Sequence, residues 1–161
     1  MYEIEPLPKL KQILLSLPEV KAWDRIVEQI ESFDRIAPVQ IFELSFCSCV
    51  AMGGELEQAE VAAAALGAAT LSVKIFDDLL DGESTALNCA LGMAGAANLA
   101  SAIQAVASRV VASSDLDGDS KHRMLALLAE AVARTARGQD LDASDRGQED
   151  DHWEMVRSKT P

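Results

Sequence analysis

Hydrophobic residues recur along most of this chain with the spacing of α-helices. After a start that contains prolines, apolar residues between positions 20 and 33 return every three or four residues, which predicts one amphipathic helix. Residues 39–52 are apolar on nearly every side, so we expect that helix to be buried in the centre of a bundle. Gly53 and Gly54 follow it and predict its end.

Three longer segments follow. Residues 57–81 contain no proline and a single glycine, which predicts about 25 residues of helix, roughly 37 Å long. Residues 85–113 are rich in Ala, Gly and Ser, and such small side chains allow close contact with neighbouring helices. Residues 121–139 carry a further apolar face, and residues 140–148 read as a polar connection. The pattern therefore predicts a single all-α domain over residues 1–161.

Composition and charge narrow the class of protein. Hydrophobic residues make up 49% of the chain and aromatic residues only 4%, so small aliphatic side chains build the core. The net charge of −12 argues against nucleic acid as a partner, because phosphate binding needs clustered Lys and Arg. The chain has three cysteines, Cys47, Cys49 and Cys89. Their odd number argues against a set of disulfides and the first two lie in an apolar segment, so we predict reduced, buried thiols. The first residues lack a secretory signal and the long apolar runs are mostly alanine, so we expect a cytoplasmic protein without a stable membrane span.

Three carboxylates crowd the end of the helix predicted for residues 57–81. Asp77 and Asp81 are four residues apart and Asp78 and Asp81 three apart, so all project from one side, with Cβ atoms roughly 5–6 Å apart. The negative end of the helix dipole disfavours carboxylates there by up to about 1 kcal/mol each. A bound Mg²⁺ would relieve this repulsion, since it commonly takes one or two carboxylates together with substrate phosphates. A solvated acidic helix end is the alternative.

Two other acidic segments invite a metal interpretation. Residues 115–119 resemble the start of a calcium-binding loop, but no Glu occupies the twelfth position, which disfavours calcium. Residues 149–152 read Glu-Asp-Asp-His, and acidic residues that open a helix are favoured by the helix dipole, so we interpret them as a cap.

Three motifs, taken in order, resemble the trans-polyprenyl diphosphate synthases, a family of the class I isoprenoid synthase fold. They are Asp77-Asp78-Leu79-Leu80-Asp81, Gly138-Gln139-Asp140-Leu141-Asp142 and Lys159-Thr160. They are similar to the family's first DDxxD motif, its later GQxxD motif on a facing helix, and its lysine–threonine pair. The resemblance covers the chain from about residue 20 to its end. It implies an isoprenoid synthase-type helical bundle, of which this chain would be the N-terminal half, because the family carries a second aspartate-rich motif further on.

The resemblance also implies a reaction. It is the Mg²⁺-dependent ionisation of an allylic isoprenyl diphosphate, with Asp77, Asp78 and Asp81 as metal ligands and catalytic residues. The positive charge of the bound Mg²⁺ would offset the negative charge that develops on the oxygens of the departing diphosphate. Lys159 and Thr160 would bind the diphosphate.

Further residues would complete the cavity. Gln139 and Asp142 would line it, by the same resemblance. Lys74 lies on the same helical face as the aspartates, where it would either reach the diphosphate or pair with a carboxylate. In the family, positions just before DDxxD help to set the length of the prenyl chain. Ser72 and Val73 are small there, which implies an open cavity and a substrate of farnesyl length or longer.

The sequence also departs from the family. Chain-elongating members carry basic segments before the buried helix and after DDxxD, whereas here the first retains only Arg35 and residues 82–87 contain no Arg or Lys. Isopentenyl diphosphate would find few cations, and burial of unpaired charge is costly. We therefore expect a divergent terpene synthase or a prenyltransferase with an unusual acceptor.

Two alternatives remain. One is an ordinary condensation of isopentenyl diphosphate with an allylic diphosphate. The other is a non-catalytic helical partner or regulatory subunit. The exposed apolar faces of half a bundle would in any case promote association with a second copy or with a missing C-terminal half.

Overall fold

The protein is described here from a computed structural model that places residues 6–32, 40–143, 153 and 156–158. Within these residues the chain forms helices and no strand, which confirms the prediction of an all-α fold. The helices are α1 (Pro6–Ser16), α2 (Pro18–Lys21), α3 (Asp24–Glu31), α5 (Gln40–Ala51), α6 (Leu56–Leu80), α7 (Ala86–Ser113) and α8 (Gly118–Ala143).

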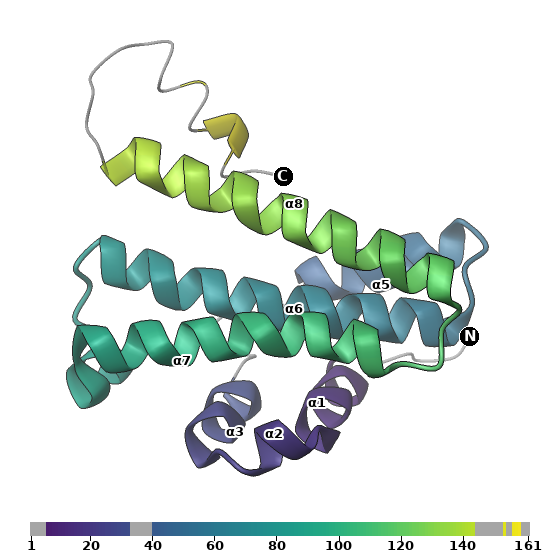
Figure 1. The fold of residues 1–161 in the computed structure, drawn as a ribbon, viewed down its shortest axis with the longest axis horizontal. Coiled ribbons are helices and arrows are strands. Elements are labelled where there is room, and N and C mark those ends of the chain that lie inside the picture. The colour runs from purple at the N-terminus through teal and green to yellow at the C-terminus, as the bar shows by residue number, and fades with distance from the viewer. Residues whose placement is uncertain (1–5, 33–39, 144–152, 154–155, 159–161) are drawn as a thin grey trace.

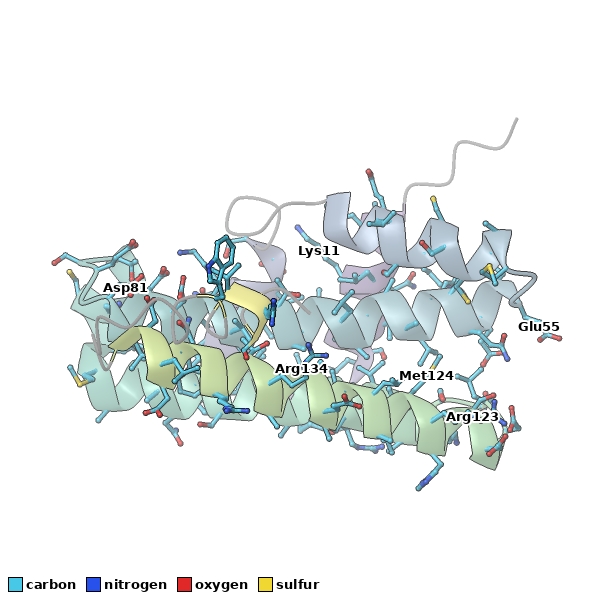
Figure 2. All side chains as sticks on the ribbon, turned by 90° about the horizontal axis from the view of Figure 1, so that it is seen from above. Lys11, Glu55, Asp81, Arg123, Met124 and Arg134 are labelled. Atoms are coloured by element: carbon cyan, nitrogen blue, oxygen red, sulfur yellow. The ribbon has the colours of Figure 1, made fainter. Side chains whose placement is uncertain are left out.

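Helix α6 is the centre of the arrangement. It lies antiparallel to α7, with α1, α2 and α3 on one side of this pair and α5 and α8 on the other (Figure 1). Seen from above, α5 and α8 run along opposite sides of α6 (Figure 2). Helix α6 packs against α1, α5, α7 and α8, so it connects the two sides of the bundle.

The contact between α6 and α7 depends on small side chains. Ala64, Ala68 and Ser72 of α6 are buried, and Ala96 and Ala100 of α7 are buried as well. Small residues at these positions let the two backbones approach closely, as the composition of residues 85–113 predicted. Larger side chains fill the remaining space, and each buried Leu or Ile stabilises the fold by about 1.5–3 kcal/mol.

The prediction of one helix over residues 20–33 is wrong. The chain turns between α2 and α3, where Trp23 is extended with φ −136° and ψ 93°. A straight helix would place Val20 and Ile26 on different faces, because six residues at about 100° each leave them far out of phase. The turn lets both side chains enter the core, where they are 0% and 2% exposed. Helix α1, which the proline-containing start concealed, begins at Pro6, where a first-turn proline costs no hydrogen bond.

Helix α5 is not the buried central helix that its composition predicted. Phe46 is buried, but Leu44 is 69% exposed and Val50 is 42% exposed. Cys47 and Cys89 are exposed and Cys49 is only half-buried, so the prediction of buried thiols is wrong for the three cysteines, although the thiols are free as expected. An apolar composition favours burial of a helix, but the described residues pack against only one side of α5. Its predicted end is confirmed, since Gly53 adopts φ +84°.

Helix α8 is longer at both ends than predicted. Asp117 precedes it, and its Oδ1 accepts hydrogen bonds of 3.0 Å from the backbone N–H groups of Asp119 and Ser120. Hydrogen bonds from Ser120 lower the pKa of the Asp117 carboxyl below its ordinary value. The acidic segment 115–119 thus begins a helix, and residues 140–143 continue that helix where a polar connection was expected. Residues 149–152 lie outside the described part of the chain.

Two helices, α6 and α7, are long and apolar enough to cross a membrane, judged by length and composition only. In α6, 61% of the most apolar window is buried inside the fold, and in α7 28%. Core packing thus accounts for most of the apolar character of α6. The expectation of no stable membrane span stays a prediction.

Candidate functional site

The aspartates lie at the C-terminal end of α6, where the turn to α7 has a defined geometry. The N–H of Glu83 donates to the carbonyl of Asp78 at 2.8 Å, and the N–H of Gly82 donates to the carbonyl of Leu79 at 3.2 Å. This pair of hydrogen bonds is a Schellman motif, which requires a left-handed residue after the helix. Gly82 provides it with φ +68°. The turn therefore fixes the backbone that carries the last aspartate.

Asp77 meets Gln139 across the interface between α6 and α8. The Gln139 Nε2 donates to Asp77 Oδ1, so two side chains that lie 62 residues apart in the sequence come into contact. Gln139 is only 9% exposed. A hydrogen bond to a charged acceptor is worth about 1.5–3 kcal/mol, more than a neutral one. Gln139 thus lies beside the aspartates, as the motif order implied.

Asp78 is paired with Lys74, one helical turn earlier. The Lys74 Nζ donates to Asp78 Oδ1, and the Asp78 side chain is 13% exposed. This hydrogen bond, reinforced by the negative charges of Asp78, Glu83 and Asp77, raises the pKa of Lys74 above its ordinary value, although partial burial opposes the rise. Of the two roles left open for Lys74, the structure shows the pairing with a carboxylate.

Asp81 and Asp142 are both exposed, Asp81 as the C-cap residue of α6 and Asp142 near the end of α8. Within the described ranges, no three Asp, Glu, His or Cys side chains are grouped closely enough to hold a metal ion. Asp77 and Asp78 are instead each held by a different donor. The donor set still suits Mg²⁺, which prefers oxygen ligands and commonly takes only one or two carboxylates together with substrate phosphates.

An apolar pocket of about 250 Å³ adjoins the Asp77–Gln139 contact. Val73 lines it, as predicted from its place before the aspartates, and so does Gln139. The other lining residues come from the same three helices: Phe76 and Leu80 of α6, Gln104 of α7, and Val132, Thr135 and Ala136 of α8. None of these residues was predicted from the sequence. Helical spacing from Val73 and from Gln139 would have found those on α6 and α8, because residues three or four apart share a face.

Ser72 does not line this pocket, which corrects the sequence-based expectation. Its side chain is 0% exposed, and its hydroxyl donates to the carbonyl of Ala100 at 2.8 Å. Consecutive helical residues point about 100° apart, so Ser72 faces α7 while Val73 faces the pocket. Lys159 and Thr160 lie outside the described residues, so their roles in binding diphosphate stay predictions. Arg35 lies outside them as well.

Comparison with known proteins identifies the fold. No protein-family model and no curated protein matches the sequence. Among solved structures, the chain is similar to the geranylgeranyl pyrophosphate synthetase from the archaeon Geoglobus acetivorans, with a TM-score of 0.75 and 20% sequence identity. The similarity covers 97% of this chain and 55% of that one, so this chain spans about half the length of the synthetase. It therefore has a trans-prenyl synthase-like helical fold.

Proposed function

We propose that this chain binds an allylic isoprenyl diphosphate and promotes the Mg²⁺-dependent loss of its diphosphate group. The observation that carries this proposal is the position of Gln139, which donates to the Asp77 carboxylate and also lines the apolar pocket. The site thus joins a carboxylate end to an apolar cavity. A molecule with an anionic head and a hydrocarbon chain matches both parts, provided that cations lie between the carboxylates and the head. The fold it shares with a geranylgeranyl pyrophosphate synthetase supports the same class of substrate.

The residues have distinct roles in this proposal. Asp77 and Asp81 would hold Mg²⁺, with Asp78 in support. When bound, Mg²⁺ supplies positive charge that offsets the charge on the departing diphosphate. Gln139 orients the Asp77 carboxylate through its hydrogen bond, and Lys74 keeps its ammonium group beside Asp78. Both contacts would hold these side chains in place for binding.

The pocket would hold the hydrocarbon chain. Val73 and Phe76 lie one turn before and immediately before Asp77, and Leu80 lies immediately before Asp81, so the chain would lie along the face of α6 beside the carboxylates. The side chains of the pocket keep water from the part of the chain beside the reacting carbon. We propose a chain of farnesyl length or longer, because Val73 leaves the wall of the pocket open.

The charges around the aspartates favour a terpene synthase, or a prenyltransferase with an unusual acceptor, over condensation with isopentenyl diphosphate. The turn after the aspartates carries Glu83 and no Arg or Lys. Among the described residues, Lys74 is a cation that lies beside these carboxylates, and it pairs with Asp78. A second diphosphate would bring further negative charge to a region that is already acidic, at a high desolvation cost.

One observation favours a second candidate, a non-catalytic partner. The chain matches 55% of the synthetase, and a diphosphate site could require residues of the remainder, supplied by a second copy or by a C-terminal half. Such a partner would bind Mg²⁺ and diphosphate without turnover.

The test is pyrophosphate release from geranyl, farnesyl and geranylgeranyl diphosphates with Mg²⁺, with and without isopentenyl diphosphate. We expect release without isopentenyl diphosphate, and a decrease of about a hundredfold or more in Asp77→Ala and Asp81→Ala, as when other groups that offset transition-state charge are removed. Asp119→Ala is the matched control, because it also replaces an aspartate by alanine, but one that pairs with Arg123 in the first turn of α8.

Three outcomes separate the candidates. Strict dependence on isopentenyl diphosphate would show the condensation reaction. Binding of Mg²⁺ and diphosphate without release would support the non-catalytic partner. Full activity in both aspartate variants would contradict the metal-ligand assignment.

A further inference from the structure

A side chain of α7 holds the turn that follows the aspartates. The Nδ2 of Asn88 donates to the carbonyl of Glu83 at 2.8 Å and lies 3.5 Å from the carbonyl of Asp78. Asp78 and Glu83 are also joined by one hydrogen bond of the Schellman motif, in which the N–H of Glu83 donates to the carbonyl of Asp78. The Asn88 amide therefore contacts both ends of this turn.

Asn88 lies in a part of α7 that is separate from the rest of that helix. Gly92 has φ 66° and ψ 170°, which are not helical values, so residues 86–91 form their own short helical segment. Thr85 caps this segment by accepting the N–H of Asn88 at 3.1 Å. Leu87 and Leu91 pack against the core. Because of the break, the segment is oriented by its own contacts with α6 and with the core.

The contact has electrostatic consequences. The last carbonyl groups of a helix carry partial negative charge, which disfavours the nearby carboxylates. An amide donor on the Asp78 carbonyl reduces that charge. The Asn88 side chain does so without a positive charge of its own, so it does not compete with a metal ion for the carboxylates.

We propose that Asn88 is a positioning residue for the aspartates. By holding the carbonyls of Asp78 and Glu83, it keeps the last turn of α6 helical and so keeps Asp81 one turn from Asp77. This inference rests on the proposed function, because the position of these carboxylates matters only if they bind a cation together.

The test compares Asn88→Ala with Thr85→Ala. Both substitutions weaken the segment 86–91, but only the first removes the amide that donates to the carbonyls of Asp78 and Glu83, whereas Thr85 accepts the N–H of Asn88. Binding of pyrophosphate is titrated calorimetrically against Mg²⁺ concentration. Exchange of the Glu83 amide hydrogen, which the Schellman motif protects, is measured by NMR without metal.

We expect Asn88→Ala to raise the Mg²⁺ concentration at half-maximal binding, and the exchange rate of the Glu83 amide, by about tenfold each, as for loss of a typical hydrogen bond. Asn88→Asp keeps the shape but lacks the donor at neutral pH, so it should have at least the same effect. Thr85→Ala should leave both quantities within about twofold, although it removes a helix cap.

Equal effects of Asn88→Ala and Thr85→Ala would overturn the positioning role, because they would show a loss of stability alone. No effect of Asn88→Ala on either quantity would overturn it as well. If the unaltered protein bound no pyrophosphate at any Mg²⁺ concentration, the proposed function would fail and this role with it. The exchange rates would still show in that case whether Asn88 holds the turn.

Discussion

The contact between Gln139 and Asp77 provides the sharpest test of the site, because it joins the two motifs across α6 and α8. Gln139→Leu keeps most of the side-chain volume and removes the donor. A hydrogen bond to a charged acceptor contributes about 1.5–3 kcal/mol, and Gln139 is only 9% exposed, so water would replace it poorly. We expect the free energy of unfolding to fall by that amount. For a chain of this size the Tm would decrease by roughly 3–12 °C.

A double-mutant cycle separates this contact from simple loss of packing. Urea unfolding of the unaltered protein, Gln139→Leu, Asp77→Ala and the double variant gives the coupling energy of the pair. Asp77→Ala removes the acceptor of the hydrogen bond, so each single variant breaks the contact. We expect a coupling of about 1 kcal/mol or more, and a value below about 0.5 kcal/mol would refute the contact as the link between the two helices. Gln104→Leu, in the same pocket but on α7, should change stability by no more than about 0.5 kcal/mol.

Three further substitutions test the pocket, the turn and the start of α8. Val73→Phe should shorten the longest diphosphate accepted in the pyrophosphate-release assay, and an unchanged preference would contradict its role in the pocket. Gly82→Ala should destabilise the protein by about 1–2 kcal/mol, the cost of the left-handed conformation; thermal unfolding should show no such loss for Gly118→Ala, where a Cβ meets open space. Asp117→Ala should weaken α8. Because folding lowers the pKa of Asp117, its carboxylate stabilises the folded protein at neutral pH. That stabilisation is lost as the pH falls from about 4 through the lower folded-state pKa. Unfolding of Asp117→Asn, compared at pH 7 and pH 3, should lack this pH dependence.

Much of the fold could be predicted from local sequence patterns. The limits of α6 and the start of α7 at Thr85 depend on capping residues, glycine and the absence of proline, all of which are visible in the sequence. The exposure of α5 could not be predicted, because it depends on which helices pack against it. The break at Gly92 was also missed, since one glycine in a long helix is a weak signal that only tertiary contacts decide.

The candidate site was predicted only in part, for the same physical reason. The pairing of Lys74 with Asp78 follows from their spacing of four residues on one helix. The contact of Gln139 with Asp77 was expected only from the resemblance to a family, since no local rule joins residues that far apart. Ser72 was assigned to the wrong surface because the rotation of α6 against α7 is fixed by packing. No sequence pattern indicated a role for Asn88, because an Asn in the first turn of a helix is common.

Under the proposed function, the charges at the end of α6 would determine the order in which cations and diphosphate bind. Asp77, Asp78, Asp81 and Glu83 lie within two turns of one another, and among the described residues Lys74 is a cation that lies beside them. Two like charges about 5–6 Å apart repel by roughly 0.7 kcal/mol in water and about 3 kcal/mol at a partly buried site. The amides of Gln139 and Asn88 orient the carboxylate and carbonyl groups there without neutralising them. A free diphosphate would add to this repulsion, so it can bind here only together with cations that the carboxylates already attract.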